Sequence, residues 1–419
     1  FVLVMLLVIV SSWIFACKIE ASAKNARKGF LLVAVSVDLT VLFIFKYLGF
    51  FTENLNRLPF VRLPVPQITL PIGISFFTFQ AISYVVDVYR GEAAQKSLWD
   101  VMLYIAFFPQ LIAGPIVRYS DFADQIHNRQ ESLQNWNRGG YRFAIGLGKK
   151  VILSNNLAYV ADAAFSSVGN LSFSMAWIGA VGYSLQLYFD FSGYSDMAIG
   201  LGQMFGFHFL ENFNYPFISR SITELWRRWH ISLGSWFRDY VYIPLGGSRC
   251  RLRRTCLNLL IVFALTGLWH GAAWQYVVFG LLHGIILCME RLGLRRALEQ
   301  LPRLFRHLYT VVLLWLTLVI FGAPGLSEGL AVLKGIFTWQ SGAKGYTLAA
   351  FADTKLLLIL AASFLLCGPV QALCPKLKAA LYAKKAPSPA GMAGLLVLLF
   401  LGLMRVTAGT YSAFIYFQF

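Results

Sequence analysis

His270 is the residue of this sequence best placed to do chemistry. It stands between two apolar runs, in Thr266-Gly-Leu-Trp-His-Gly271. An imidazole is a natural general base at neutral pH, and partial burial keeps it neutral and able to accept a proton. An ionisable group at membrane depth costs about 2.5–3.5 kcal/mol, so it normally faces a protein or water cavity. We therefore predict a catalytic His270. The alternative is a buried histidine that bonds a carbonyl and holds helices together. The neighbouring Gly267 and Gly271 leave room for a substrate or for another backbone.

A second histidine, His230, lies in a stretch rich in tryptophan and arginine. Ser221 followed by Glu224 is a capping box that predicts the start of a helix. Apolar residues then recur at helical spacing as far as Tyr240. The pattern predicts one amphipathic helix at the cytoplasmic interface of a membrane, with tryptophans at headgroup level. A lipid-anchored surface helix with an incidental histidine is the alternative.

Basic and aromatic residues of the same stretch are candidates for binding a substrate. Arg227, Arg228 and Arg238 lie on its polar face, and such a cluster suits the phosphates of a nucleotide thioester such as coenzyme A. Trp229 and Trp269, each directly before a histidine, complete the predicted substrate-binding set on this side.

Two aspartates occur deep in an apolar stretch, in Tyr188-Phe-Asp-Phe-Ser-Gly-Tyr-Ser-Asp-Met197. Asp190 and Asp196 are six residues apart, so an unbroken helix does not place them on one face. Gly193 between them would allow a bend. Each aspartate could pair with a nearby basic residue or orient a histidine. We expect structural pairing for Asp196 and keep Asp190 as a candidate substrate-binding residue.

Composition places these residues in a membrane protein. Of 419 residues, 58% are hydrophobic and 13% charged, whereas soluble domains keep about a quarter of their residues charged. The net charge of +17 comes from basic clusters in short loops between apolar runs, which is the positive-inside pattern and suits anionic lipid headgroups. Nucleic-acid binding is disfavoured. The histidines are too scattered to suggest a metal site, and no bound cofactor is expected.

The apolar runs predict a multi-pass topology with the basic clusters on the cytoplasmic side. Residues 257–289 have basic clusters at both ends, so they form a hairpin that turns inside the membrane. Thirteen helical residues from Leu257 carry His270 about 20 Å deep, near the bilayer midplane. The connections 52–69 and 324–353 and the C-terminus suit the outer side, and 99–117 dips without crossing. Residues 1–16 look like a membrane helix whose N-terminal part is missing. The runs are about 1–16, 29–51, 70–89, 99–117, 141–165, 173–207, 257–269, 271–289, 309–323, 354–373 and 390–418.

Long motifs in order give the chain a family resemblance. They are Leu70-Pro-Ile-Gly-Ile-Ser-Phe-Phe-Thr-Phe-Gln, Phe108-Pro-Gln-Leu-Ile-Ala-Gly-Pro-Ile, the run from Tyr188, Glu211-Asn-Phe-Asn-Tyr-Pro-Phe, Arg227-Arg-Trp-His-Ile-Ser-Leu, Trp236-Phe-Arg-Asp-Tyr-Val-Tyr-Ile-Pro-Leu-Gly-Gly-Ser-Arg, Thr266-Gly-Leu-Trp-His-Gly-Ala-Ala-Trp and Phe414-Ile-Tyr-Phe-Gln-Phe. With these the chain resembles the AlgI-like, alginate O-acetyltransferase branch of the membrane-bound O-acyltransferase (MBOAT) family. A departure is Phe321-Gly-Ala-Pro, where many relatives have an aromatic followed by Phe-Arg-Ala.

The resemblance implies a single all-α polytopic membrane domain over 1–419, with its catalytic core at about 180–290. Tilted and re-entrant helices would form a ring around a central tunnel, in the bacterial inner membrane. The acyl donor, acetyl-coenzyme A or an acyl carrier protein thioester, would come from the cytoplasm and the polysaccharide acceptor from the far side. His270 takes the place of the family's essential histidine and His230 that of its second conserved position. His230 or a nearby backbone amide would stabilise the oxyanion.

Several alternatives remain open from sequence. The polymer could be peptidoglycan or another exopolysaccharide, and an extracytoplasmic acetyltransferase could be the partner protein. A transporter or channel also shows midplane polar residues and broken helices, but the basic amphipathic helix and the lack of an inverted repeat disfavour it. A non-catalytic membrane scaffold is the third possibility.

Overall fold

The computed structural model confirms an all-α polytopic membrane protein. It describes residues 1–166, 171–339, 341, 347–351, 353–374, 389–408 and 414–415. Of these residues 77% are helical, and none lies in a strand. Six of the described helical segments are long and apolar enough to cross a membrane: Val2–Ala21, Lys24–Leu55, Leu252–His270, Trp274–Gln300, Arg303–Gly322 and Thr354–Leu373.

The chain divides into two compact units, and the prediction of one domain over 1–419 stays a prediction. The first comprises Phe1–Asn135 and Gly202–Leu210. Its elements are α1 (Val2–Ala21), α2 (Lys24–Leu42), the π-helical η1 (Phe43–Tyr47), α3 (Leu48–Leu55), α4 (Ile74–Arg90), α5 (Leu98–Ala106), α6 (Phe108–Leu111), α7 (Tyr119–Phe122) and α8 (Gln125–Asn128). Helix α9 (Leu133–Gly148) leads into the second unit.

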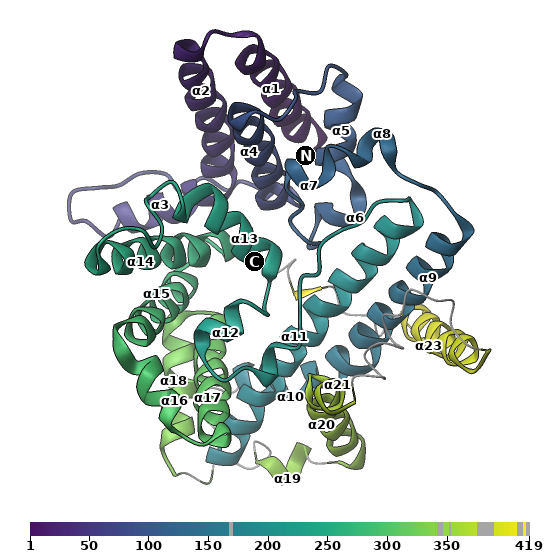
Figure 1. The fold of residues 1–419 in the computed structure, drawn as a ribbon. Coiled ribbons are helices and arrows are strands. Elements are labelled where there is room, and N and C mark those ends of the chain that lie inside the picture. Colours follow the sequence, from purple (N-terminus) through teal and green to yellow (C-terminus); the bar gives the residue numbers. More distant parts are fainter. Residues whose placement is uncertain are drawn as a thin grey trace. The chain divides into compact units, whose positions relative to one another are not determined.

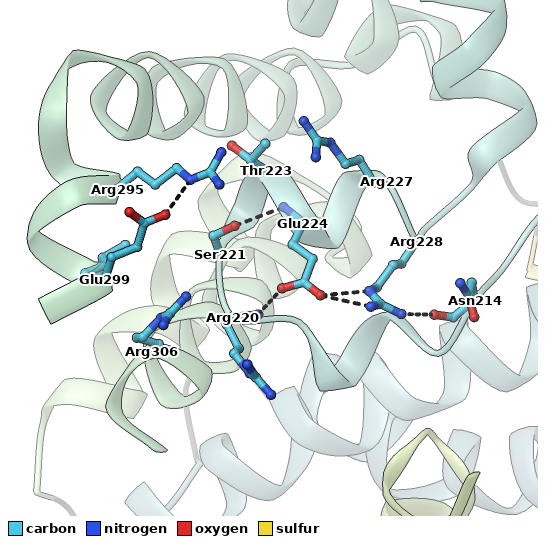
Figure 2. A pocket seen from close by; sticks show the side chains of 11 residues that line it. Asn214, Arg220, Ser221, Thr223, Glu224, Arg227, Arg228, Arg295, Glu299 and Arg306 are labelled. Carbon is cyan, nitrogen blue, oxygen red and sulfur yellow. Dashed lines mark hydrogen bonds and ion pairs between the residues drawn. The ribbon is translucent and has the colours of Figure 1, made fainter. Parts of the chain in front are cut away.

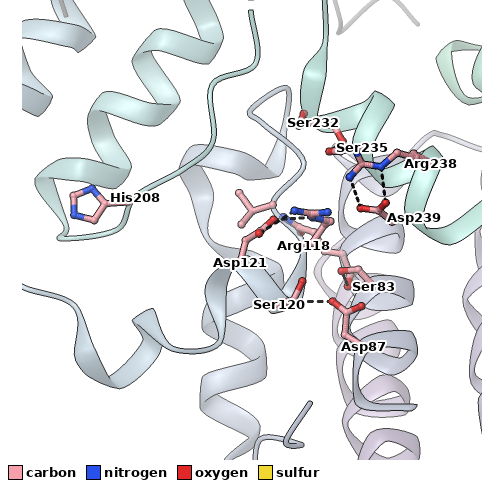
Figure 3. Close-up of polar contacts among 12 residues, drawn as sticks. Ser83, Asp87, Arg118, Ser120, Asp121, His208, Ser232, Ser235, Arg238 and Asp239 are labelled. Carbon is pink, nitrogen blue, oxygen red and sulfur yellow. Dashed lines mark hydrogen bonds and ion pairs between the residues drawn. The ribbon is translucent and has the colours of Figure 1, made fainter. Parts of the chain in front are cut away.

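Residues 99–117, which were predicted to dip into the membrane without crossing it, form short helices. Helix α5 has nine residues, which span about 14 Å, and the chain then turns at Phe107 into the four-residue α6. The loop that follows is fixed by polar contacts, shown in Figure 3. Arg118 pairs with Asp121 at 2.7 Å, and the Ser120 amide donates to the Asp87 carboxylate at 3.0 Å. The segment is therefore a packed connection.

The second unit comprises Trp136–Leu201 and Glu211–Phe419 and holds every predicted site residue. Its elements are the π-helical η2 (Lys149–Ser154), α10 (Asn155–Ser166), α11 (Phe173–Met204), the 3₁₀ turn η3 (Pro216–Ile218), α12 (Ile222–Trp226), α13 (Ile231–Phe237), the π-helical η4 (Arg238–Tyr242), α14 (Leu252–His270), α15 (Trp274–Met289), the π-helical η5 (Glu290–Leu294), α16 (Arg295–Gln300), α17 (Arg303–Gly322), α18 (Leu326–Phe337), α19 (Leu348–Phe351), α20 (Thr354–Leu366), α21 (Pro369–Leu373) and α23 (Pro389–Thr407).

The predicted hairpin over 257–289 is present as the antiparallel pair α14 and α15 (Figure 1). Glycines allow the two backbones to touch. A Cβ added at Gly267 would lie 2.2 Å from the Tyr276 carbonyl oxygen, and one at Gly280 2.2 Å from the Phe263 carbonyl oxygen. A Cβ at Gly271 would meet the Tyr276 ring. The glycines beside His270 thus admit the neighbouring helix, and they fix the end of α14 against α15.

Helix α11 is a continuous 32-residue helix that packs closely on α9 and α10. A Cβ at Gly193 would lie 2.8 Å from the Gly146 carbonyl oxygen of α9, and one at Gly179 would lie 2.3 Å from the Ala164 side chain of α10. Gly193 therefore serves close helix packing, and the helix continues through it without a break. The six-residue spacing then directs Asp190 and Asp196 to different partners.

Buried charges of α11 pair with basic residues of α9 and of η2, the segment that follows it. Asp190 and Lys150 form an ion pair in which both side chains are 2% exposed. The other Asp190 oxygen accepts from the Ile415 amide at 3.0 Å. Asp196 pairs with Arg142 at 2.8 Å and Lys149 at 2.6 Å. The structural pairing expected for Asp196 is present. Asp190 is also held in an ion pair, with Lys150.

We predict that Asp190→Ala lowers the free energy of unfolding by about 3–5 kcal/mol, because it leaves the buried Lys150 ammonium without its carboxylate. Thermal unfolding in detergent, followed by tryptophan fluorescence, measures the loss. Adding Lys150→Met should restore part of it. Asp239→Ala is the matched control: its partner Arg238 is 59% exposed, and such pairs contribute at most about 1 kcal/mol. An Asp190→Ala variant as stable as the wild type would show that the pair is not structural.

Candidate active site

His270 is the last residue of α14, at the tip of the hairpin. Its side chain is buried, at 7% exposed. The imidazole lies among aromatic rings, with ring centres 5.1 Å from Trp269 and 5.1 Å from Phe321. Phe321 comes from the end of α17 and also packs on Tyr276 of α15 at 5.1 Å. Residues of three helices therefore pack around the imidazole. One of them, Phe321, is also the first residue of the Phe321-Gly-Ala-Pro sequence that departs from the family motif.

The prediction of one amphipathic helix over 221–240 is wrong in its continuity. The capping box is present, since the Ser221 hydroxyl accepts from the Glu224 amide at 3.0 Å. Helix α12 then ends at Trp226 and α13 begins at Ile231. The segment around Asn212 causes the break by supplying other backbone partners: the Ile231 amide donates to the Asn212 carbonyl, and the Asn214 amide donates to the Arg228 carbonyl, both at 2.9 Å. These bonds replace helical ones.

His230 occupies the break and faces His270. Its backbone is left-handed, with φ 47° and ψ 52°, which is uncommon for a residue other than glycine. The side chain is 1% exposed, and its ring centre lies 6.4 Å from that of His270 and 5.8 Å from that of Trp269. Burial, and to a lesser extent the neighbouring His270, lowers the pKa of His230 well below its usual value. The structure thus brings together the two histidines predicted as catalytic.

Trp229 and Trp269 differ in what they contact. Trp229 packs into an aromatic cluster with Phe213 at 5.4 Å and Tyr188 at 6.0 Å, so its contacts are those of a core residue. Trp269 is 3% exposed and touches both histidines. Of the two tryptophans predicted to bind substrate, Trp269 is the one whose ring packs against both catalytic candidates.

A buried carboxylate that the sequence analysis missed holds α12 in place. Glu290, 2% exposed at the end of α15, accepts hydrogen bonds from the Ile222 amide at 2.7 Å and from the Thr223 amide at 2.9 Å. The Thr223 hydroxyl and the Tyr309 hydroxyl also donate to it, at 2.5 and 3.1 Å. A negative charge is favourable at a helix N-terminus. In the sequence, Glu290 stands beside Arg291 at the edge of a basic loop, which hides its role.

A cavity of about 630 Å³ opens beside His270. The loop that directly follows the histidine, Gly271 to Ala273, forms part of its wall. Polar side chains at the wall include Gln186, whose side chain is 7% exposed and whose Oε1 has no hydrogen-bond partner among the described residues. The lining residues are Ala158, Asp162, Phe165, Ser166, Tyr183, Gln186, Gly271, Ala272, Ala273, Gln275, Tyr276, Gly322, Ala323, Pro324 and Ile415.

A second, basic pocket of about 450 Å³ lies at α12 (Figure 2). Arg227 and Arg228, both predicted to bind substrate, line it together with residues of α16 and α17. Five arginines stand against two glutamates, so the pocket is positively charged. Arg238 does not line it and instead forms a two-point pair with Asp239 at 2.7 and 3.0 Å (Figure 3). The lining residues are Asn214, Arg220, Ser221, Thr223, Glu224, Arg227, Arg228, Arg295, Leu298, Glu299 and Arg306.

The candidate binding residues are therefore separated by the fold. Asp190 is held by Lys150, Ser154 and Ile415, whereas Arg227 and Arg228 belong to the basic pocket.

Comparison with known proteins supports the resemblance seen in the motifs. The model of the membrane-bound O-acyltransferase family matches residues 74–326. The chain is 40% identical to "Probable alginate O-acetylase AlgI" of Pseudomonas putida, over 98% of this chain and 89% of that protein. It is 46% identical to the Pseudomonas aeruginosa protein of that name, over 75% of this chain and 62% of that protein. It is 37% identical to "Peptidoglycan O-acetyltransferase" of Helicobacter pylori, over 78% of this chain and 68% of that protein.

The chain spans less than two thirds of the Pseudomonas aeruginosa relative but most of the Pseudomonas putida one. The family model covers both histidines and the hairpin that carries His270. The chain therefore belongs to the membrane-bound O-acyltransferase family, as its motifs predicted, and its enzyme class is that of an O-acyltransferase.

Proposed function

We propose that this protein transfers an acetyl group from a cytoplasmic thioester towards a hydroxyl of an extracytoplasmic polysaccharide, with alginate as the first candidate polymer. The observation that carries the proposal is the position of His270, buried beside His230 and directly preceding a loop that lines a cavity. The names of the Pseudomonas relatives support the acetyl group and the alginate acceptor.

His270 acts as the general base in this proposal. It takes the proton of the acceptor hydroxyl while that oxygen attacks the thioester carbonyl, and the carbon–sulfur bond then breaks. The proton passes from His270 to the departing thiolate, so the products are an O-acetyl ester and a free thiol. Positioned proton transfer of this kind contributes about 10²–10⁴-fold to rate.

The cavity beside His270 is our candidate for acceptor entry. It is lined by the end of α10, the residues after α17, Ile415 and the hairpin tip. Under the positive-inside topology, the first three of these belong to the outer side, and the hairpin tip lies about 20 Å from its basic ends. A hydroxyl that enters from outside would reach the loop Gly271 to Ala273, which directly follows the histidine and forms part of the wall of this cavity.

The basic pocket is our candidate for the donor's phosphate groups. Arg227 is exposed and Arg306 keeps Nε without a hydrogen-bond partner among the described residues. Guanidinium groups match phosphate oxygens in geometry and charge. Arg238, which was predicted for the same role, contributes less because Asp239 already neutralises it. Acetyl-coenzyme A is the first donor to test, and an acyl carrier protein thioester is the second.

The names of other relatives suggest alternative acceptor polymers for the same family. The Helicobacter pylori relative acts, by its name, on peptidoglycan, and at 29% identity the Bacillus subtilis relative is a "Teichoic acid D-alanyltransferase". We therefore keep peptidoglycan or another exopolysaccharide as the alternative polymer. An extracytoplasmic acetyltransferase that completes the transfer, and residence in the bacterial inner membrane, belong to the same proposal.

We predict that His270→Ala abolishes thiol release and acetyl transfer, since no other group replaces the base. The measurement is turnover of labelled acetyl-coenzyme A by purified protein in nanodiscs, with polymer acetylation followed in cells. His208→Ala is the control, because His208 is exposed and its backbone amide makes the local bond to Gln125. Polymer acetylation unchanged in His270→Ala would instead favour a non-catalytic scaffold, and substrate flux without thioester consumption would favour a transporter.

We predict that Arg227→Gln raises KM for acetyl-coenzyme A about tenfold and leaves kcat within about twofold, because a lost phosphate contact of about 1.4 kcal/mol acts on binding. Steady-state thiol release measures both constants. Arg296→Gln is matched in charge, since Arg296 is exposed on α16 but does not line the pocket. Equal effects of the two substitutions would mean that only net charge matters and that the pocket is not the donor site.

A further inference from the structure

Asn212 makes four polar contacts around His230. The Asn212 side chain is fully buried. Its Oδ1 lies 3.1 Å from His230 Nδ1, 3.2 Å from the Ser232 amide and 2.8 Å from the Ser232 hydroxyl. Its Nδ2 donates to the Ser195 hydroxyl at 2.9 Å. Four contacts therefore fix one side chain between α11 and the start of α13.

The Ser232 backbone amide decides which way the Asn212 amide points. A backbone N–H can only donate, so the atom of Asn212 that faces it must be an acceptor. Reversing the amide would place the Nδ2 group against the Ser232 N–H, donor against donor. The oxygen of Asn212 therefore faces Ser232, and the same oxygen faces His230.

The orientation of Asn212 in turn decides the tautomer of His230. An oxygen that accepts from Nδ1 requires a proton on Nδ1, and in the neutral ring Nε2 is then an acceptor. Burial favours the neutral ring, since the pKa of His230 is lowered. Nε2 is buried and has no hydrogen-bond partner among the described residues. The ring thus presents an unused lone pair inside the site.

The distance between the two histidine rings rules out a direct hydrogen bond between them. Their ring centres are 6.4 Å apart. Ring nitrogens lie about 1 Å from the centre, so two nitrogens stay about 4 Å apart, too far for a direct hydrogen bond. His270 therefore does not take up the lone pair of His230 Nε2.

We propose that Asn212 is a positioning residue that holds His230 with its proton on Nδ1, so that His230 Nε2 accepts a hydrogen bond from a hydroxyl of the acceptor sugar. This assigns His230 a role different from the oxyanion donor expected from sequence, because an acceptor nitrogen cannot donate to a negative oxygen. Stabilisation of the oxyanion is left to another donor, such as a backbone amide. The role in the reaction rests on the proposed function, whereas the tautomer does not.

The first test reads the tautomer directly by ¹⁵N NMR of protein with ¹⁵N-labelled histidine in nanodiscs at neutral pH. His230→Gln identifies the signals of His230 among the six histidines. We expect a neutral ring with the proton on Nδ1 in the wild type and a mixture of tautomers in Asn212→Leu. A wild-type ring with its proton on Nε2, or with both nitrogens protonated, would overturn the proposal whether or not turnover is detected.

The second test follows acetyl-coenzyme A turnover against pH. Asn212→Leu cannot accept from His230, and we expect kcat to fall about a hundredfold. Asn212→Asp still accepts from Nδ1, so it should keep most of the activity. Its negative charge raises the pKa of His230. The proposed role requires a neutral His230 ring. With a raised pKa the ring stays protonated up to a higher pH, so the acid limb of the pH profile moves to higher pH.

Two comparisons separate positioning from stability. Thermal unfolding shows whether Asn212→Leu is folded, and Asn156→Ala serves as control because its amide donates to the Ile152 carbonyl of its own helical segment. If both Asn212 variants turn over like the wild type at every pH, the positioning role is wrong. If the wild type itself is inactive towards every thioester, the proposed function fails, and the NMR result still decides the tautomer.

Discussion

The buried Glu290 carboxylate is the contact on which the arrangement of the site depends. It binds the first turn of α12 to the end of α15 and, through Tyr309, to α17. A five-residue helix has little stability of its own, so these bonds decide where α12 lies. The basic pocket and the break that carries His230 are both built on that helix. This one carboxylate therefore helps to position both the basic pocket and His230.

A second buried polar contact holds the opposite side of α12. The Trp226 indole N–H donates to His283 Nδ1 at 3.2 Å, and His283 Nε2 lies 3.0 Å from the Thr317 hydroxyl. Because the indole can only donate, Nδ1 must accept and Nε2 carries the proton. His283 is therefore a neutral histidine that joins α12, α15 and α17. His230 and His283 therefore hold opposite tautomers, each dictated by a neighbour that can bond in one way only.

Periodicity and charge predicted the parts of this fold in which each residue is governed by its own segment. The hairpin of α14 and α15 and the capping box at Ser221 are of this kind. For Asp196 the sequence indicated that a basic partner was needed, but not that Arg142 and Lys149 of other segments supply it. The break between α12 and α13 could not be predicted, because its cause is the backbone near Asn212, distant in sequence from the helix it interrupts. Glu290, Lys150 and Asn212 were missed for a similar reason: their partners come from other elements. His270 and His230 were found from an ionisable group in an apolar run and from the family motifs, but the motifs carry no information on tautomers.

The left-handed backbone of His230 has a consequence for which amino acids can occupy this position. With φ at 47°, a β-branched or bulky aliphatic residue is sterically excluded, and glycine, asparagine, aspartate and histidine are the residues that enter this conformation most readily. Glycine offers no side chain, asparagine does not titrate, and a buried aspartate carries a charge that is costly to desolvate. Histidine alone combines the required backbone with a neutral side chain that can still take up a proton. The backbone conformation at position 230 thus limits which side chains can stand there, and with them the acid–base chemistry that this position can perform.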